Sequence, residues 1–392
     1  MNGKPTINSS GSSRVAEIAL AFLRLGFIGF GGAAAHIAMM EEEFVRRRKW
    51  LTREEFVDRV GAVSLLPGPS STELAIYLGQ LRGGIAGLIV AGCAFVLPSA
   101  VLVASLAWFY VRFGTTPQVE AVLFGVKPVV VALIVQAVWS LGRVALKSKE
   151  MIVLAAVVLG LAAMHVSAIA LLLGTGVAWI VAERFGAAPG GAKAASGALV
   201  QTGTAAAGTA ATGMSVPTVT AVFLYFLKVG AVLFGSGYVL LALLRADLVE
   251  RLHWLTENQL LDAIAVSQGT PGPFFTVATF VGYVLGGWRG AAVATAGMFL
   301  PAFVFVAITA KYLPMLRKSP MASAFLDGVN AAAVALMAFV GWQFARATLG
   351  SVPTMLIAIV AAVLLLRFRV NSAWLVLGGA VAGIALRLAH MA

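Results

Sequence analysis

Residues 65 to 73 read Leu-Leu-Pro-Gly-Pro-Ser-Ser-Thr-Glu, and this stretch decides how the first part of the chain folds. Apolar residues flank it on both sides, as in a helix that enters a membrane. Proline has no backbone N–H and clashes with the preceding turn, so a helix must break at Pro67-Gly68-Pro69. Broken backbone at membrane depth persists only against protein or a water-filled cavity, which favours a re-entrant helical hairpin over residues 56 to 80.

The same break recurs 204 residues later as Pro271-Gly272-Pro273. Working outward from the breaks, other motifs repeat in the same register. Phe30-Gly31-Gly32 returns as Phe234-Gly235-Ser236 and Trp50-Leu51-Thr52 as Trp254-Leu255-Thr256, and after a one-residue gap Gly83-Gly84 returns as Gly286-Gly287 and Pro98 as Pro301. A register kept over more than a hundred residues indicates an internal repeat.

The repeat predicts four parts of the chain. Residues 1–13 form a polar tail, 14–185 the first repeat, 186–216 a linker and 217–392 the second repeat. The linker is almost entirely Gly, Ala, Ser, Thr and Pro, with Lys193 as its one charge. This composition cannot bury a core and is typical of a flexible connection.

The composition indicates an integral membrane protein. Hydrophobic residues make up 60% of the 392 positions and charged residues only 11%, against roughly 45–50% and 25% in soluble domains. The net charge is +12, but the basic residues lie in short loops and form no stripe with interleaved aromatics, so nucleic acid is not an expected partner. The single cysteine, Cys93, excludes an intrachain disulfide, and the four histidines lack the neighbours of a metal site. We therefore expect no cofactor.

Apolar stretches in the first half cover about 15 to 40, 84 to 110, 119 to 142, 151 to 164 and 167 to 183. A spanning helix needs about 20 residues, so the first three are long enough and the last two are short. With five crossings per half, the second repeat is inverted relative to the first. The fold predicted is all-α, with about ten transmembrane helices in two inverted five-helix repeats, each holding one broken re-entrant hairpin.

The distribution of Lys and Arg tests this topology. Residues 41–55, 143–149, the linker, 311–318 and Arg367 with Arg369 fall on the cytoplasmic side, while 245–257 falls outside. The basic clusters then follow the positive-inside rule in non-equivalent loops of the two halves, as an inverted repeat requires. Lys4 and Arg14 would lie outside, contrary to the rule.

Inverted repeats with discontinuous helices are typical of secondary transporters whose substrate binds near the membrane midplane. A helix restarts after each break, and its free N–H groups and positive dipole end suit an anion. Hydroxyl and amide groups near the breaks could add contacts. The candidate substrate-binding residues here are Pro67, Gly68, Pro69, Ser70, Ser71, Thr72, Gln268, Thr270, Pro271, Gly272, Pro273 and Thr276.

Three basic residues within apolar segments are further candidates for binding the anion. Arg24 and Lys228 are equivalent under the repeat, whereas Lys127 has the uncharged counterpart Asn330. An ionisable group inside a span is costly and usually faces a pathway. The alternative is that each cation reaches the membrane interface or pairs with an acid such as Glu17, Glu73 or Glu120.

A second set of residues is a candidate for coupling or gating. Glu73, whose counterpart is Val277, could carry a proton or simply neutralise Arg24 or Lys127. Asp58 and Asp262 match across the repeats, and capping or loop pairing is favoured for them over chemistry. A lone histidine such as His36 is more often a packing residue than a functional one. The glycines of the Phe-Gly motifs, Gly31, Gly32 and Gly235, complete the set, although close helix packing is the simpler role for glycine pairs.

Several of these motifs carry a family resemblance. The Phe30-Gly31-Gly32 motif with the following Ala35 to Met40 segment, Trp50-Leu51, Leu66 to Pro69, and Ser267-Gln268 with Pro271-Gly272-Pro273 resemble the chromate ion transporter family in its long two-domain form. The resemblance implies a multi-pass carrier of the bacterial inner membrane that exports chromate and confers resistance. The motif positions carried over are Phe30, Gly31, Gly32, His36, Pro67, Gly68, Pro69, Gln268, Pro271, Gly272 and Pro273. Ala33 and Ser64 stand where many members have Pro and Gln, which puts identical selectivity in doubt.

The residues alone leave several functions open. Chromate and sulfate share charge and tetrahedral shape, so the sequence does not separate them. An anion-selective channel could use the same cavity, and a homodimer is a possible assembly. A membrane enzyme is disfavoured because no nucleophile, base and orienting group are found together.

Overall fold

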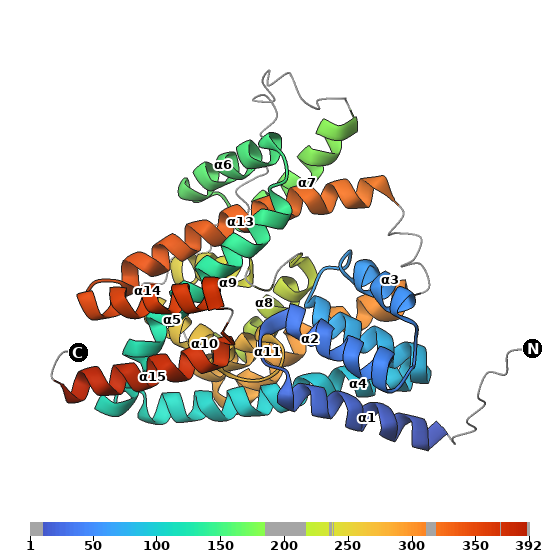
Figure 1. Cartoon of the computed structure of the whole chain (residues 1–392), viewed down its shortest axis with the longest axis horizontal. Helices are drawn as coiled ribbons and strands as arrows, with labels where there is room; N and C mark the ends of the chain where they lie inside the picture. Colours follow the sequence, from blue (N-terminus) through green and yellow to red (C-terminus); the bar gives the residue numbers. More distant parts are fainter. Residues whose placement is uncertain are drawn as a thin grey trace, which may run out of the picture.

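Glycine and proline positions divide this chain into helices that pack as one all-helical body in a computed structural model (Figure 1). The structure describes residues 11–184, 217–234, 237, 239–310, 319–368 and 370–389. The predicted linker, the basic loop 311–318 and Gly235 therefore lie outside the described residues. No strand occurs in the ranges described. The first half contains α1 (Gly11–Ile28), α2 (Gly32–Met40), η1 (Glu41–Arg47), α3 (Arg53–Val63), α4 (Ser70–Phe113), α5 (Pro117–Ala145), α6 (Lys149–Ala163) and α7 (Ala168–Arg184).

The second half repeats this order of elements, with the short 3-10 helix η3 added after α10. They are α8 (Val219–Val232), α9 (Val239–Leu244), η2 (Arg245–Arg251), α10 (Glu257–Gly269), η3 (Phe274–Thr276), α11 (Val277–Thr309), α13 (Pro320–Thr348), α14 (Val352–Phe368) and α15 (Ser372–Leu388). Even irregular features return at the 204 spacing: η1 and η2 are both π-helices. Lys49 and His253, which follow them, both have positive φ. The repeated sequence therefore builds repeated local structure.

The first apolar stretch forms a hairpin, so the expectation of one spanning helix over residues 15 to 40 is wrong. The chain turns at Gly31 and Gly32, with φ of 104° and 79°, where residues with a side chain are strained. As a result, η1 returns beside the start of α1. Glu17 accepts hydrogen bonds from Trp50 Nε1 at 3.1 Å and from Arg48 Nη1 at 3.2 Å. The start of α1 and residues 48–50 thus share one end of the molecule, so Arg14 belongs with the basic loop and not opposite it.

A second hairpin surrounds each Pro-Gly-Pro break. α3 ends at Val63 and α4 begins at Ser70, after which the chain runs back along α3. The guanidinium carbon of Arg59 on α3 lies 5.6 Å from the ring centre of Tyr77 on α4, which shows the antiparallel pairing. Both α3 and α10 begin with a capping box, at Thr52 and Thr256 respectively. The cap fixes where each inward helix starts.

Helices α4 and α11 each reverse once more at a glycine pair. Gly83 and Gly84 have φ of −134° and 61°, and their counterparts Gly286 and Gly287 have −154° and 60°. Beyond the first corner the two arms of α4 approach so closely that a Cβ on Gly79 would overlap the backbone oxygen of Gly87. Each helix therefore consists of a short arm that starts at the Pro-Gly-Pro break and a long arm that runs the length of the molecule.

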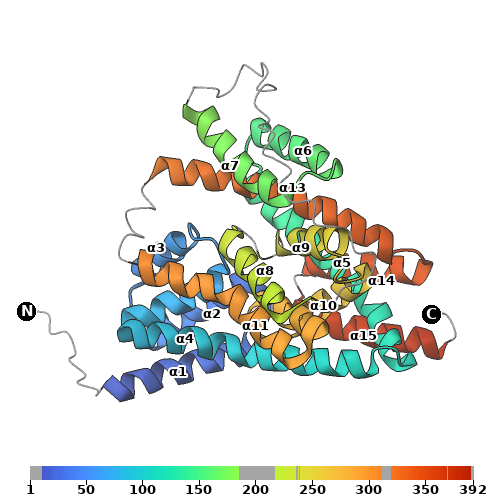
Figure 2. The same cartoon turned by 180° about the vertical axis from the view of Figure 1, so that it is seen from behind.

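The long arms of α4 and α11 pack together and run in opposite directions (Figure 2). The far end of α4 meets the second half, where the Tyr110 hydroxyl donates to Asp262 Oδ2 on α10 at 2.9 Å. The far end of α11 meets the first half, where the Tyr77 hydroxyl donates to the Ala310 carbonyl at 3.4 Å. The two glycine corners consequently lie at opposite ends of the molecule.

The last helices of each half pack on the other half. α6 and α7 pack against α13, while α14 and α15 pack against α5. Small residues allow the close approach: a Cβ on Gly125 of α5 would overlap the backbone of Gly379 and Gly383 on α15. The two halves are therefore interlocked, and α5 and α13 also contact each other.

The two ends of the molecule are packed differently. α9 and α10 contact the bundle of α5, α7, α13 and α15, whereas α2 and α3 pack mainly on α1, η1 and α4 of their own half. Equivalent residues show the contrast: Val57 on α3 is 51% exposed and its counterpart Leu261 on α10 is 1% exposed. α10 is thus buried against the bundle, whereas the equivalent face of α3 is exposed.

Within the part of the chain that the structure describes, four helices are long and apolar enough to cross a bilayer: α4, α5, the η3–α11 unit and α13. At 1.5 Å per residue, the 29 residues of α5 extend about 43 Å, more than the roughly 30 Å of the hydrocarbon core. α8, α14 and α15 are apolar but shorter. Large apolar side chains such as Trp139 and Trp342 point outward, 61% and 64% exposed, as expected for contact with lipid. The structure is thus consistent with a membrane protein.

Candidate functional site

The two Pro-Gly-Pro breaks are held by the opposite half of the chain. The backbone N–H of Gly68 donates to the Leu233 carbonyl at 2.7 Å, and that of Gly272 donates to the Gly29 carbonyl at 2.6 Å. Gly29 and Leu233 are equivalent residues that follow α1 and α8. Both glycines are buried and have positive φ, and a Cβ on Gly272 would overlap the side chain of Ser99. Each break therefore fits only a glycine and is fixed by the other half.

Hydrogen bonds connect the first break to the second through His36. Nε2 of the buried His36 ring lies 3.0 Å from the Gly29 carbonyl and Nδ1 lies 3.3 Å from Ser71 Oγ. Since the carbonyl requires a donor, a neutral ring carries its proton on Nε2 and accepts from the Ser71 hydroxyl. Gly29 thus receives hydrogen bonds from His36 and Gly272 together. We call Gly29, His36, Ser71 and Gly272 the polar junction.

A matching pair of hydroxyls lies on the second-half side of the polar junction. Ser99 Oγ on α4 and Thr276 Oγ1 on η3 are 3.0 Å apart, and Thr276 also donates to the Pro273 carbonyl at 2.8 Å. Both residues are fully buried. Ser99 was not expected from the sequence, since it sits in the middle of an apolar run whose second-half counterpart is Ala302.

Glu73 lies in the first turn of α4, directly beside the first break. Its side chain is fully buried, and neither carboxyl oxygen has a hydrogen-bond partner among the described residues. The carboxyl oxygen Oε1 lies against Gly68, so closely that a Cβ on that glycine would meet it. The neighbouring Thr72 hydroxyl is buried and unpartnered in the same part of the structure. The sequence suggested Arg24 or Lys127 as a neutralising partner for Glu73, and neither pairs with it here.

The other expected residues of the breaks fall into two groups. Thr270 is buried and its hydroxyl donates to the Ser267 carbonyl at 3.2 Å, so it caps the end of α10. Ser70, Pro67, Pro271 and Gln268 are half-buried, and Pro69 and Pro273 are buried. The N-termini of α4 and η3 both begin here, and the N–H groups of Thr72 and Thr276 donate to the carbonyls of Pro69 and Pro273 at 2.7 and 3.0 Å.

The two symmetric cations lie away from the polar junction. Arg24 is exposed, on the side of α1 where it acts electrostatically on Glu43 of η1. Lys228 is exposed and lines a pocket of 450 Å³ between the loop after α6, α8, η2 and α13. The structure therefore does not bring Arg24 and Lys228 together in one site.

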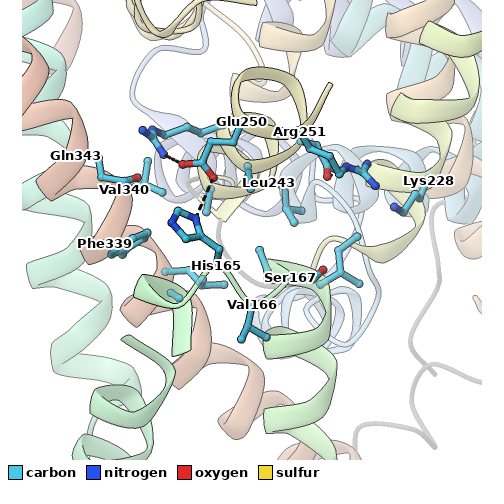
Figure 3. A pocket seen from close by; sticks show the side chains of 18 residues that line it. His165, Val166, Ser167, Lys228, Leu243, Glu250, Arg251, Phe339, Val340 and Gln343 are labelled. Atoms are coloured by element: carbon cyan, nitrogen blue, oxygen red, sulfur yellow. Dashed lines mark hydrogen bonds and ion pairs between the residues drawn. The ribbon is translucent and has the colours of Figure 1, made fainter. Parts of the chain in front are cut away.

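The pocket of Lys228 is rich in charge (Figure 3). Glu250 pairs with Arg245 and lies 4.0 Å from Nδ1 of His165, while Arg251 pairs with Asp247 at 2.9 Å. Lys228 has neither a hydrogen bond nor an ion pair within the described ranges. Because its neighbours are already paired, Lys228 is the cation in this pocket that is left for a further anion.

Lys127 does pair with an acid, but with one that was not suggested. Its Nζ lies 3.1 Å from Asp262 Oδ1 and 3.3 Å from Asn258 Oδ1, both on α10. The partner comes from the second half, so no reading of the first repeat alone could have identified it. Capping or loop pairing had been favoured for Asp262, whereas the structure pairs it with Lys127 inside helix α5. Gly31 and Gly32 form the turn of the first hairpin.

Comparison with known proteins now assigns the chain to a family. The sequence pattern described as "Chromate transporter" matches residues 16–182 and again residues 220–384. The chain belongs to the chromate transporter family. Members of this family are transporters and not enzymes. The two matches fall within the two halves in which the elements recur, which agrees with the spacing of the repeated motifs.

Three named relatives align with most of the length of this chain. A chromate transport protein of Cupriavidus metallidurans is 32% identical over 382 residues, 96% of this chain and 94% of the relative. A chromate transport protein of Pseudomonas aeruginosa is 33% identical over 359 residues, 85% and 82% of the two chains. A probable chromate transport protein of Synechococcus elongatus is 32% identical over 354 residues, 87% of each. No solved structure matches this chain.

Proposed function

We propose that this chain is a secondary transporter that exports chromate, or another tetrahedral oxyanion, across the bacterial inner membrane. The observation that carries the proposal is the meeting of two broken helices across the halves, through the hydrogen bonds of Gly68 and Gly272. Each break directs the N-terminus of a helix toward the same region. The positive end of the helix dipole and the N–H groups at the start of a helix stabilise an anion.

The relatives support chromate as the substrate, because three of them are named for chromate transport. Physical chemistry supports a tetrahedral dianion but treats chromate and sulfate alike. Export of chromate, and the chromate resistance that follows from it, are proposed in addition to the family assignment. The antiparallel long arms of α4 and α11 support two halves inserted in opposite orientations, as in other transporters with inverted repeats.

We further propose that Glu73 couples transport to protons. A charged carboxylate without partners is very costly in an apolar surrounding, so we expect Glu73 to be in its neutral form in this conformation. Exposure to water in another conformation would let it release the proton. Val277 at the equivalent position shows that the break itself does not need an acid.

A carrier is favoured over an anion channel by the packing of the two ends. A channel must open to both sides at once, whereas here α9 and α10 pack on the bundle and the equivalent faces of α2 and α3 do not, so the two ends are packed differently. In alternating access, one binding site is closed first toward one side of the membrane and then toward the other.

Inverted membrane vesicles test the proposal. We expect saturable uptake of labelled chromate, stimulation by an imposed pH gradient or potential, and faster uptake when the vesicles are preloaded with unlabelled chromate. Preloading accelerates a carrier but not a channel, so its lack of effect would favour the channel. Vesicles with the protein that take up no more chromate than empty vesicles would refute the proposal, and competition by sulfate would define the selectivity.

A further inference from the structure

One end of the molecule is closed by an ion pair between the two halves. Lys127 on α5 and Asp262 on α10 face each other at 3.1 Å, with side chains 19% and 5% exposed. Tyr110 from the end of α4 donates to the second carboxyl oxygen of Asp262. Asn258, one turn earlier on α10, accepts from Lys127. This network, which we call the latch, joins two helices of the first half to α10.

The lysine and the tyrosine of the latch have no like counterpart in the second half. Asp58 on α3 is the counterpart of Asp262, so the acid is present in both halves. Asn330 replaces Lys127, however, and Leu313 replaces Tyr110. If α3 closed against α13 as α10 closes against α5, Asp58 would meet an amide and not an ammonium group. The repeat is therefore symmetric in its acids but not in its cations.

Packing follows the same asymmetry. At the end that carries the latch, Leu261 and Ala242 are only 1% and 3% exposed, although the latch residues themselves line a pocket of 430 Å³. At the other end the equivalent Val57 is 51% exposed and Ala38 is exposed as well. The two residues of each equivalent pair are similar in size and polarity. The difference in exposure therefore comes from how α2, α3, α9 and α10 pack on the rest of the molecule.

We propose that the pair formed by Lys127 and Asp262 sets the resting conformation of the transport cycle, with the second-half end latched and the first-half end open. The proposal rests on the alternating access of the proposed function. In the opposite conformation α10 would leave α5, the latch would break, and α3 would close against α13 at a position where Asn330 stands in place of Lys127. Lys127 and Asp262 are thus positioning residues: they decide which side of the carrier is open and do not need to touch the anion.

Cysteine labelling tests the latch without any chromate. The reporters are Val57→Cys and Leu261→Cys, made one at a time in a Cys93→Ala background and labelled with a maleimide in lipid nanodiscs. With the latch intact we expect rapid labelling at position 57 and slow labelling at position 261. Lys127→Asn, which copies the second half, should raise the rate at 261 at least tenfold and lower the rate at 57. Lys147→Asn, an exposed lysine just after α5, is the matched control and should change neither rate.

Two further variants make the test reciprocal. Adding Asn330→Lys to Lys127→Asn moves the lysine to the other end, opposite Asp58, and should protect position 57 while exposing position 261. The charge swap Lys127→Asp with Asp262→Lys should return both rates to the original values, although each single change does not. The swap also covers the case in which a single variant fails to fold, as judged by its gel-filtration profile.

The outcomes are distinct. Unchanged rates at both positions in folded Lys127→Asn would overturn the proposal, and so would a swap variant that folds but remains open at 261. A rise at 261 with no fall at 57 would show local loosening and would also overturn it, because the ends would not be coupled. A protein that transports no chromate but shows the expected labelling would refute the proposed function alone.

Discussion

Glu73 is the residue whose surroundings conflict most with its chemistry. A fully buried carboxyl group without a partner destabilises the fold, by roughly 1–3 kcal/mol for an unsatisfied polar group. The equivalent Val277 avoids this cost. A residue that breaks local rules without a structural gain is expected to be functional. Two substitutions separate the structural effect of Glu73 from its effect on transport.

We expect Glu73→Val to raise the apparent melting temperature in detergent, because it removes an unpaired polar group. Glu73→Val and Glu73→Gln should both abolish the dependence of chromate flux on a pH gradient. Exchange of labelled for unlabelled chromate across the membrane of preloaded vesicles should continue. Measuring chromate-driven pH change in the vesicle lumen checks this. Glu54→Gln, an exposed acid on α3, is the control and should leave coupling intact. Proton movement that persists in Glu73→Gln would assign coupling to another group.

Lys228 permits a second prediction at the residue scale. Among the described residues it has no ion-pair partner, and its pocket lies apart from the polar junction. If chromate passes through this pocket on its way to the junction, Lys228→Gln should raise the apparent KM for chromate, whereas Lys228→Arg should have a milder effect because the charge remains. A lost charge-assisted contact is worth about 1.5–3 kcal/mol, or about tenfold to a hundredfold in affinity. Kinetics normalised to protein amount provide the check. An unchanged KM in the Gln variant would leave Lys228 with a role at the membrane interface only.

At the scale of the element, the proline breaks and the glycine corners do different work. The prolines end one helix and let another begin at the polar junction, and the glycines allow the arms of α4 and α11 to approach. Substitutions at these positions should therefore fail in different ways.

We expect Pro67→Ala and Pro271→Ala to abolish transport while most of the protein still folds. Without proline, the preceding helix can continue and its carbonyls occupy the N–H groups that would bind the anion. Transport assays with membrane levels measured by immunoblot decide the matter. A variant present at normal level that transports at nearly the original rate would contradict the role of the breaks.

Substitutions at the glycines where the arms of α4 approach each other should lower the thermal stability of the protein. Gly79→Val would force the arms of α4 apart, because even a Cβ there overlaps Gly87 and Ala91, and overpacking costs about 1–3 kcal/mol. The thermal stability of the purified protein should therefore fall. Gly160→Ala on α6 is the matched control, since a Cβ there meets nothing within 4 Å. Equal melting temperatures for Gly79→Val and the original protein would exclude this account of the corner.

At the scale of the whole molecule, the structure places equivalent hairpins of the two halves at opposite ends. Arg47 and Arg251 are equivalent residues with side chains 55% and 59% exposed, and their hairpins lie at opposite ends. Ser13, at the start of α1, lies at the same end of the molecule as Arg47. In a Cys93→Ala background we expect Ser13→Cys and Arg47→Cys to react with an impermeant reagent from the cytoplasmic side and Arg251→Cys from the other side. Reaction of Arg47→Cys and Arg251→Cys from the same side would end the inverted arrangement.

Much of this organisation was determined by sequence alone, because it depends on local rules. Proline acts on the backbone within a few residues, so both breaks and the register of the repeat follow from residue type and spacing, whereas the glycine pairs were expected to serve packing and their corners were not predicted. The apolar composition determined the all-helical membrane class, and the paired motifs led to the family.

Tertiary structure alone decided the rest, because it depends on contacts between residues far apart in the chain. The stretch from 15 to 40 is apolar enough to span a membrane, but its two helices gain more by folding into a hairpin in which Glu17 meets Arg48 and Trp50. Lys127 obtained its acid from α10 of the other half, and Gly68 and Gly272 obtained their acceptors across the same interface. Those partners are about 130 to 240 residues apart in sequence, and only the packing of interlocked halves could select them.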